Sequence, residues 1–425
     1  MEKTNILLLG SGGRESALAW KLASSPRCGE LSIAPGNGGT GAYGTNVAIS
    51  PMDFEAVATY CREHNVQLLV AGNEDPLVAG IYDYMRENMP GVLVLGPSKG
   101  AARLEGSKDF AKDFMTRHGI PTAAYRSFTA ASVDEGKEFL GTLKPPYVLK
   151  ADGLAAGKGV LIIDSLDEAR KALDEMVGGM FGHSSDCVVI EEFLSGIECS
   201  VFVLTDGNGG YRILPVAKDY KRRFEGDKGP NTGGMGAVSP VPFADAEFMG
   251  KVEERIIRPT IDGLMKDGLV YRGFIFLGLI NCGGEPKVIE YNVRMGDPET
   301  EVVMPRLDSD LVELGLAAAA GNLGDLRCDA IPETACTVIV VSDGYPGSYP
   351  KGLEITGDLQ PEGSIIFQAG TKLADGRLVT SGGRVMAVTS LGGSIEEALE
   401  RSYAALRGIH YEGISYRSDI GRDLM

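Results

Sequence analysis

Short apolar runs that each end in a glycine or proline loop recur through the N-terminal part of the 425-residue chain. The runs are residues 5–9, 31–34, 67–71 and 92–95, and intervals with helical character separate them. Continuous apolar runs of this length are typical of parallel strands that are buried on both faces. The pattern therefore predicts a doubly wound α/β domain, whose ligands bind at the carboxyl ends of the strands.

The loop after the first run reads GSGGRE and spans Gly10–Glu15. A strand, a glycine loop and a helix in succession aim backbone N–H groups at an anion. The loop is not a full GxGxxG, and no acidic residue ends a second strand about twenty residues later, as a dinucleotide site requires. A plain tight turn explains the loop equally well. Glu74 and Asp75 follow the third run and are expected at the same edge of the sheet.

Composition and charge narrow the classes of function. The net charge of −17 disfavours a nucleic-acid or anionic membrane surface, although a few basic residues can still focus potential on phosphorylated small molecules. Seven cysteines without CxxC spacing indicate neither a disulfide framework nor a zinc site. No apolar run approaches the roughly 18 residues of a membrane span. Met1–Thr4 leads directly into a strand without room for a signal peptide, so we expect a cytoplasmic protein.

Two lysines and a glycine-rich loop mark the middle of the chain. Lys108 precedes the helical segment 109–118, and Lys150 ends a short strand. The loop at 151–160, ADGLAAGKGV, then leads into another strand, whereas a P-loop requires GxxxxGK[ST] before a helix. A loop without bulky side chains can fold its amides over a polyphosphate, and Lys158 adds positive charge. A flexible hairpin is the alternative, and Lys108 taken alone is typical of a surface lysine.

Acidic and basic segments follow. Residues 187–194, CVVIEEFL, predict an apolar strand that ends in acids, with Glu198 just beyond. Such acids suit an adenine amino group and a ribose hydroxyl, and an ordinary surface turn explains them equally well. The basic run KDYKRR opens residues 218–236, which show no strand or helix period and predict a long loop of functional importance. A helix is expected within 244–266.

The strand that opens the segment 287–306 shows a clean alternation. Its predicted packed face consists of Ile289, Tyr291 and Val293. Its polar face consists of Glu290, Asn292 and Arg294, spaced about 7 Å apart. Two oxygen ligands beside a cation suit Mg²⁺ that holds phosphate oxygens, whereas a solvated edge strand is the plainer alternative. The acids of GDPETE directly after the strand are unfavourable without a nearby cation, which favours a metal and phosphate site.

Strand 274–280 and the turn at Gly283-Gly284 predict an antiparallel hairpin that delivers the chain into this polar strand. Residues 311–320 have helical character. Composition then shifts, and residues 333–425 alternate short β-rich runs with turns before a late helix at 395–406. The expected strands of this part are 337–341, 364–368 and 384–388. The C-terminal part is therefore expected to form a small α+β unit.

In order and spacing, these features resemble the ATP-grasp superfamily and most closely its glycinamide ribonucleotide synthetase family. The matching motifs span the chain and read GSGGRE (10–15), KADGLAAGKGV (150–160), DYKR (219–222), GPNTGGMGA (229–237), NVRMGDPETE (292–301), YPGSYPKG (345–352), QAGT (368–371) and TSGGRV (380–385). One departure is visible, because residues 72–77 read GNEDPL where that family has proline second.

The resemblance implies three units: an N-terminal α/β domain at 1–104, an ATP-grasp domain at 105–328 with a flap at about 122–192, and a C-terminal α+β domain at 329–425. It also implies that glycine is joined to 5-phosphoribosylamine through a glycyl phosphate. The products would be glycinamide ribonucleotide, ADP and phosphate, in de novo purine synthesis. Another ATP-grasp ligase or carboxylase of purine synthesis is the alternative, and a non-catalytic nucleotide-binding protein is a third hypothesis. The GGMG and YPGSYPKG runs speak against the carboxylase.

The resemblance assigns roles residue by residue. ATP is expected at Lys108, Lys150, Gly153, Gly157, Lys158, Gly159, Glu191, Phe193, Leu194 and Glu198. Mg²⁺ or Mn²⁺ is expected on Glu290 and Asn292. Arg294 would act on the transferring phosphoryl group or the glycine carboxylate, and Asp219 on the glycine ammonium. Phosphoribosylamine is expected at Gly10, Gly12, Gly13, Arg14, Glu15, Glu74 and Asp75. A monomer is expected, and the four histidines lie outside the motifs, so no general base is evident.

Overall fold

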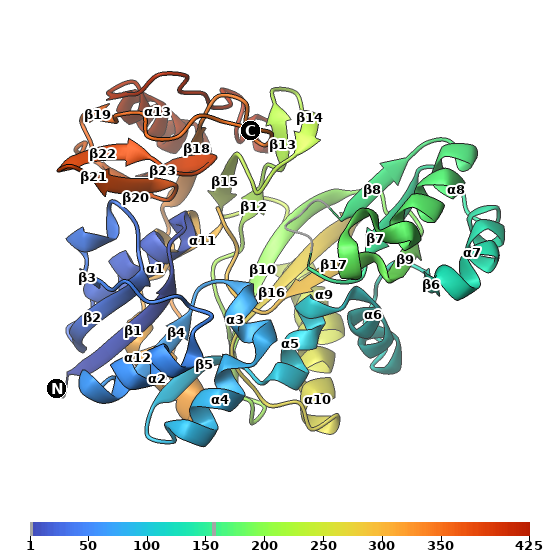
Figure 1. Ribbon diagram of the computed structural model, residues 1–425, viewed down its shortest axis with the longest axis horizontal. Helices are drawn as coiled ribbons and strands as arrows, with labels where there is room; N and C mark the ends of the chain where they lie inside the picture. The colour runs from blue at the N-terminus through green and yellow to red at the C-terminus, as the bar shows by residue number, and fades with distance from the viewer. Residues whose placement is uncertain (1–2, 155–158) are drawn as a thin grey trace.

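A parallel sheet forms the N-terminal part of the computed structural model, which describes residues 3–154 and 159–425 (Figure 1). Its strands are β1 (Thr4–Gly10), β2 (Cys28–Pro35), β3 (Thr45–Asn46), β4 (Leu68–Ala71) and β5 (Leu93–Pro97). They follow the order β3-β2-β1-β4-β5, and Ile6 of β1 lies opposite both Leu31 and Leu68. The predicted doubly wound domain is confirmed.

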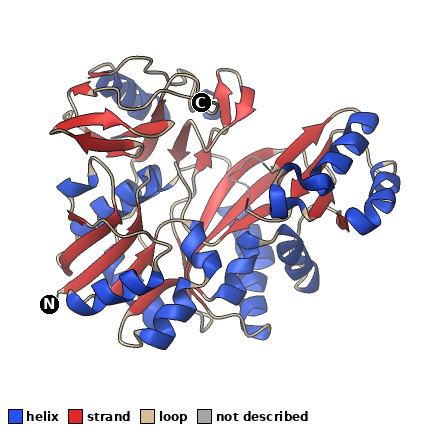
Figure 2. Ribbon diagram, in the orientation of Figure 1, coloured by secondary structure: helices blue, strands red, loops and turns tan. Residues whose placement is uncertain are grey.

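Helices cover both faces of this sheet, as its apolar strands require (Figure 2). Ile6 and Leu8 point into one core, and Leu7 and Leu9 point into the other. The first core is covered by α1 (Gly13–Ala23) and α12 (Leu311–Ala320), and the second by α2 (Phe54–Glu63) and α4 (Ile81–Asn88). Because α12 follows far beyond β5 in the sequence, a distant part of the chain completes this layer.

The sheet continues into the middle of the chain. Its added strands are β10 (Ile197–Thr205), β11 (Tyr211–Ile213), β16 (Tyr271–Cys282) and β17 (Glu285–Asn292). Tyr271 of β16 pairs with Pro97 of β5, so one sheet crosses the expected boundary at residue 104. The helices of this region include α3 (Glu74–Ala79), α5 (Lys99–Gly106), α6 (Lys108–Arg117), α9 (Ala246–Val252) and α10 (Arg258–Lys266). The division into three domains stays a prediction.

The predicted hairpin is present, and it contains a β-bulge that the alternation did not predict. Gly283 and Gly284 form its turn with positive φ angles of 65° and 91°. Glu290 pairs with Gly278, but Val288 pairs with the next residue, Leu279, so Ile289 is the extra residue of β17. The bulge places Val288 in the core, with Tyr291 and Val293, and leaves Ile289 on the lining of a cavity. The prediction that Ile289 is packed on the core face was therefore wrong.

A separate four-stranded sheet projects from this body, at the right of Figure 1. Its order is β6-β9-β7-β8, formed by β6 (Tyr125–Thr129), β7 (Tyr147–Ala151), β8 (Val160–Ile163) and β9 (Cys187–Glu191). Helices α7 (Val133–Leu140) and α8 (Leu166–Glu175) share a small core with it, built around Phe128 and Leu173. The predicted strands on either side of the glycine-rich loop are confirmed, and the predicted strand at 187–194 ends at Glu191.

The C-terminal unit is a five-stranded antiparallel sheet of order β12-β15-β18-β23-β20. Its own strands are β18 (Thr334–Val341), β20 (Ser364–Gln368) and β23 (Arg384–Gly392), packed on α13 (Ile395–Leu406). Small pairs join β19 (Thr356–Gly357) to β24 (Ile409–His410) and β21 (Thr371–Ala374) to β22 (Arg377–Thr380). The expected α+β unit is confirmed.

The predicted long loop at 218–236 was wrong in part, because the segment contains short strands. They are β12 (Lys218–Asp219), β13 (Arg222–Phe224), β14 (Lys228–Asn231) and β15 (Gly236–Ser239). Strands of two to four residues are too short for an alternation to show. No helix among the described residues is long and apolar enough to cross a membrane.

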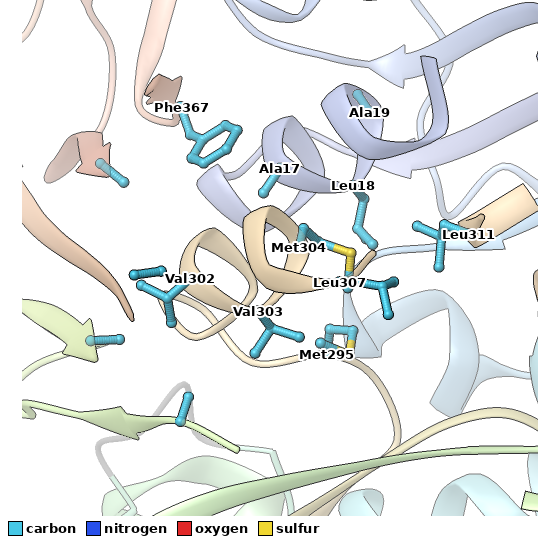
Figure 3. Close-up of a cluster of buried hydrophobic side chains, with 14 of the residues drawn as sticks. Ala17, Leu18, Ala19, Met295, Val302, Val303, Met304, Leu307, Leu311 and Phe367 are labelled. Atoms are coloured by element: carbon cyan, nitrogen blue, oxygen red, sulfur yellow. The ribbon is translucent and has the colours of Figure 1, made fainter. Parts of the chain in front are cut away.

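Helix α11 (Thr300–Arg306) joins the end of β17 to the N-terminal unit. Figure 3 shows Met304 of α11 beside Leu18 of α1, and both side chains are buried. This packing brings the segment that follows β17 against the glycine loop that opens α1.

Candidate active site

A cavity of about 190 Å³ lies where the projecting sheet, α6 and β17 meet. Its charged lining residues are Glu74, Glu105, Lys108, Lys112, Lys150, Glu191, Glu290 and Arg294, with Asn292 beside them. These residues come from α3, α5, α6, β7, β9 and β17. The structure therefore brings together seven of the predicted polar residues, Glu74, Lys108, Lys150, Glu191, Glu290, Asn292 and Arg294, from five separate stretches of sequence.

Two lysines approach the cavity from the ends of their elements. Lys108 begins α6, where Ser107 caps the helix, and its Nζ donates to the carbonyl of Gly153 at 3.1 Å. Burial lowers the pKa of the Lys108 ammonium, partly offset by the negative charge of Glu290. Lys150 is buried at the end of β7, and its Nζ lies 3.0 Å from Glu191. Both ammonium groups can neutralise phosphate charge.

Glu191 lies between Lys150 and Lys112. Its Oε2 is 3.2 Å from the Lys112 Nζ, while its Oε1 is buried and has no hydrogen-bond partner among the described residues. Burial lowers the pKa of Lys112 to about 8 in spite of this carboxylate. The free Oε1 is an acceptor for a donor group that enters the cavity.

The two expected metal ligands face the cavity side by side. The Asn292 amide donates to Glu290 Oε1 at 3.3 Å, and its oxygen accepts from Arg294 at 3.0 Å. Burial alone would raise the pKa of Glu290, but Lys221 and Lys150 hold it below its ordinary value. The described residues contain no group of three or more His, Cys, Asp or Glu side chains able to hold a metal. An ionised carboxylate and an amide oxygen fit Mg²⁺ whose other ligands are phosphates and water.

Arg294 is clamped at the end of β17 by two carboxylates. Its Nε lies 3.2 Å from Glu74 and its Nη2 lies 2.9 Å from Glu105. Glu105 also accepts from the Val293 amide at 2.7 Å, which ties α5 to the backbone of β17. Burial raises the pKa of Glu105 to about 7, although Arg294 opposes the shift. The guanidinium is therefore held in place before any ligand arrives.

Asp219 and Lys221 form a neighbouring charged group that is not part of the cavity lining. The Lys221 Nζ lies 2.6 Å from Glu198. Burial raises the pKa of Asp219, partly offset by Lys221. Asp219 lies in β12, the edge strand of the C-terminal sheet, and Lys221 follows that strand. The charge of Lys221 lowers the pKa of Glu290, and the charge of Glu290 raises the pKa of Asp219. The two charged groups are thus electrostatically linked.

The GSGGRE loop is held together by its own carboxylate. Glu15 accepts from the Gly12 amide at 2.5 Å and from Arg14 Nε at 2.7 Å. Gly10 has φ +129°, and a Cβ there would lie 2.4 Å from the Glu15 Cγ, so only glycine fits. Arg14 also donates to the carbonyl of Met295 at 3.2 Å, which links the loop to the end of β17.

Three family models match most of the chain. Residues 4–105, 106–300 and 335–423 match the N domain, the ATP-grasp (A) domain and the C domain of phosphoribosylglycinamide synthetase. The chain belongs to the phosphoribosylglycinamide synthetase family.

Individual proteins similar to this chain support the same family assignment. The chain is 48% identical to a phosphoribosylamine–glycine ligase of Pseudomonas aeruginosa, over 98% of this chain and 97% of that protein. It is 47% identical to one of Chlorobaculum tepidum, over 98% and 99%. The crystal structure of a phosphoribosylamine–glycine ligase from Thermotoga maritima has a TM-score of 0.86 and 38% identity, covering 98% of this chain and all of that one. A biotin carboxylase of Campylobacter jejuni shares the fold alone, with 15% identity and a TM-score of 0.75 over 97% and 93% of the two chains.

Not every residue expected for a phosphoribosylglycinamide synthetase site lines the cavity. Gly159 lines the cavity, whereas Gly153 lies outside the lining and accepts a hydrogen bond from the lining residue Lys108 through its carbonyl. Phe193, Leu194 and Glu198 follow β9 outside the lining, and Asp75 is exposed beside Glu74. Gly10, Gly12, Gly13, Arg14 and Glu15 lie at the start of α1, and Gly157 and Lys158 lie outside the described residues.

Sequence reasoning missed three charged residues of this phosphoribosylglycinamide synthetase site. Lys112 lies one helical turn after Lys108, and this i, i+4 spacing was a usable signal. Lys221 lies inside the DYKR motif. Glu105 had no signal of its own, because its pairing with Arg294 depends on how α5 packs against β17.

Proposed function

We propose that this chain joins glycine to 5-phosphoribosylamine at the expense of ATP, giving glycinamide ribonucleotide, ADP and phosphate. The observation that carries the proposal is the convergence of Lys108, Lys150, Glu290, Asn292 and Arg294 on one cavity in a phosphoribosylglycinamide synthetase fold. A carboxylate is a poor acyl donor, and its conversion to a glycyl phosphate supplies a leaving group. Phosphoryl transfer depends mainly on positioning and on neutralising charge, which this cavity provides.

Each part of the cavity has a place in this reaction. Lys108 and Lys150 bind the ATP phosphates, next to Gly153, whose carbonyl accepts from Lys108, and Gly159, which lines the cavity. Glu290 and Asn292 would hold Mg²⁺ or Mn²⁺, which neutralises the β- and γ-phosphate charge when bound. Arg294, fixed between Glu74 and Glu105, stabilises the transferring phosphoryl group or orients the glycine carboxylate.

The remaining contacts are assigned by the same proposal. The unpartnered Oε1 of Glu191 accepts from the adenine amino group, with Phe193 and Leu194 near the ring, and Glu198 binds the ribose. Asp219 holds the glycine ammonium. Phosphoribosylamine binds at Gly10, Gly12, Gly13, Arg14 and Glu15 of the α1 loop, across from Glu74, whereas the exposed Asp75 contributes least. We further propose that the protein acts as a monomer in the cytoplasm, which rests on the family resemblance.

The test supplies ATP, Mg²⁺ and freshly generated phosphoribosylamine with glycine, bicarbonate or formate, and measures ADP. We expect ADP release only when glycine and the amine are both present, with glycinamide ribonucleotide formed in equal amount. ADP release that depends on bicarbonate or formate instead would replace the ligase by a carboxylase-type or formate-dependent enzyme. ADP release without either the acid or the amine would exclude the proposed ligation.

A further inference from the structure

Two carboxyl groups on the segment after β17 lie at the N-terminus of α1. Glu301 is fully buried, and neither of its oxygens has a hydrogen-bond partner among the described residues. Its Oε1 lies 2.4 Å from the point where a Cβ on Gly13 would stand. Asp297 Oδ2 lies 3.2 Å from the corresponding point on Gly12. Both carboxyl groups therefore face the first turn of α1.

Asp297 is held in this position by the C-terminal unit. Arg384 of β23 places its Nη2 3.1 Å from Asp297 Oδ1, and its Nη1 donates to the Asp297 carbonyl at 2.8 Å. The same Nη1 donates to the carbonyl of Gly233 at 2.5 Å. These contacts occupy Oδ1 and leave Oδ2 toward Gly12, with 16% of the side chain exposed. Asp297 is therefore fixed and still accessible to a ligand.

Glu301 lies close enough to Asp297 for the two carboxyl groups to interact. Burial and the charge of Asp297 raise the pKa of Glu301 well above its ordinary range, and Arg384 opposes the shift. A neutral carboxyl group can donate a hydrogen bond, and the adjacent acceptor is Asp297. The charged groups that face this pair are Arg14 and Glu15 of α1 and Arg384 of β23.

Asp297 lies between the two sites where the substrates of the expected reaction would bind. Two residues separate it from Arg294, which lines the ATP cavity. On its other side is the start of α1, where Glu15 already accepts from the Gly12 amide and the following amides of the first turn suit the phosphate group of a phosphorylated amine. A carboxylate between an acyl-phosphate site and a phosphate-binding helix end is placed to meet the amine of such a substrate.

We propose that Asp297 is a catalytic residue that binds the attacking amine and takes its proton, with Glu301 as a positioning residue. This inference rests on the proposed function. The amine nitrogen uses its lone pair to form the C–N bond with the acyl carbon of glycyl phosphate. The acyl C–O bond breaks, and its electron pair leaves with inorganic phosphate. One N–H proton passes to the Asp297 carboxylate and from there to solvent.

The test separates activation of glycine from attack by the amine. Activation is measured with ATP, Mg²⁺, glycine and hydroxylamine, which traps the acyl phosphate as a hydroxamate and needs no base at neutral pH. Ligation is measured with phosphoribosylamine. Asp297→Asn is expected to lower kcat for ligation about 100-fold or more, the range of general-base catalysis, and to leave trapping within about threefold. If trapping is too slow to measure, the KM for glycine in the ligation assay reports on the glycine site instead, and Asp297→Asn should leave this KM unchanged.

The matched control is Asp375→Asn, in the β21–β22 turn, where φ of +50° suits asparagine and both activities should stay at the wild-type level. Equal loss of trapping and ligation in Asp297→Asn, or unchanged ligation, would overturn the inference. Absence of glycine-dependent ADP release in the wild type would instead overturn the proposed function, and with it this inference.

The positioning role of Glu301 is tested without altering Asp297. Glu301→Gln keeps a neutral donor of the same shape, so ligation should stay within about threefold of the wild type. Glu301→Leu removes the donor and should lower ligation about tenfold or more, again without loss of trapping. Equal ligation rates in the two variants would exclude a role for the shared hydrogen bond. This pair also decides the question if Asp297→Asn does not fold.

Discussion

Glu290 and Asn292 are the oxygen ligands that the proposed metal site takes from the protein. Glu290→Gln removes the negative charge, and Asn292→Leu removes the amide oxygen. Each should lower ADP release at least about 100-fold, because phosphate charge is then not neutralised. Unfolding by urea should change little, since neither side chain belongs to the apolar cores.

The matched control for these two variants is Glu285→Gln at the other end of β17. Its carboxylate pairs with Lys251 and Arg255 on the surface, away from the cavity. It should keep wild-type turnover, and the metal concentration for half-maximal rate should not move. Wild-type rates in both Glu290→Gln and Asn292→Leu would remove them as metal ligands.

Glu105 makes stability depend on pH. Its pKa is about 7 in the folded protein, above its ordinary value of 4.5, so the native state binds more protons than the unfolded state between these pH values. Its contribution is complete below pH 4.5 and is lost as pH rises through 7. From pH 5 to pH 8, the free energy of unfolding should fall by roughly 2–3 kcal/mol more in the wild type than in Glu105→Gln.

Urea titrations of both proteins at pH 5 and pH 8 measure this difference. Other titrating groups contribute to both proteins and cancel in the comparison. An equal fall in the two proteins would show that Glu105 is ionised in the native state throughout this range.

At the scale of elements, the contact between α1 and α11 carries the segment with Asp297 to the glycine loop. Leu18 is buried between these helices beside Met304 (Figure 3). Leu18→Ala should lower the free energy of unfolding by about 2–5 kcal/mol, because it leaves a cavity that neighbouring side chains fill only in part. Urea unfolding gives the value, and Met265→Ala, at an exposed position, should stay within about 0.5 kcal/mol of the wild type.

Elements with a strong local pattern could be predicted from the sequence. The parallel strands of the N-terminal unit, the hairpin turn at Gly283-Gly284 and α13 follow their apolar runs and turn residues. The bulge at Ile289 could not be predicted, because it arises from the pairing of β17 with β16 rather than from β17 alone. Strands β12 and β15 gave no pattern, because they form by pairing: β15 pairs with β18, and β12 pairs with β15 at the edge of the sheet.

The same distinction applies to the candidate site. Glu290 and Asn292 lie at strand positions whose direction the alternation indicates, Lys150 ends a predicted strand, and all three line the cavity. Glu105 could not be predicted, because its role depends on contact between elements that are far apart in sequence.

At the scale of the whole molecule, neither the N-terminal sheet nor the C-terminal sheet is built from one continuous stretch of the chain. Helix α12 covers the N-terminal sheet, and β12 and β15 extend the C-terminal sheet. The C-terminal segment adds to this, since Asp423 accepts from Tyr220 at 2.6 Å and pairs with Lys218 at 3.1 Å, on either side of Asp219. The proposed glycine-binding carboxylate is therefore held by residues of the last unit.

This interleaving predicts how an isolated C-terminal unit behaves. A fragment of residues 329–425 lacks β15, so β18 has an open edge, and the Ile339 amide loses its bond to the Met235 carbonyl, 3.0 Å long in the full chain. Hydrogen exchange at Ile339 should then approach the rate of an exposed amide, whereas it is slow in the whole protein. The Ala369 amide, which donates to Val385 within the fragment at 2.9 Å, is the internal control and should stay protected.

A protected Ile339 amide in the fragment would mean that the unit closes its own edge, and that β12 and β15 are added to a sheet that is already stable. Loss of protection at both amides would extend the dependence to the entire unit, because it would show that the sheet does not form without the strands that carry Asp219.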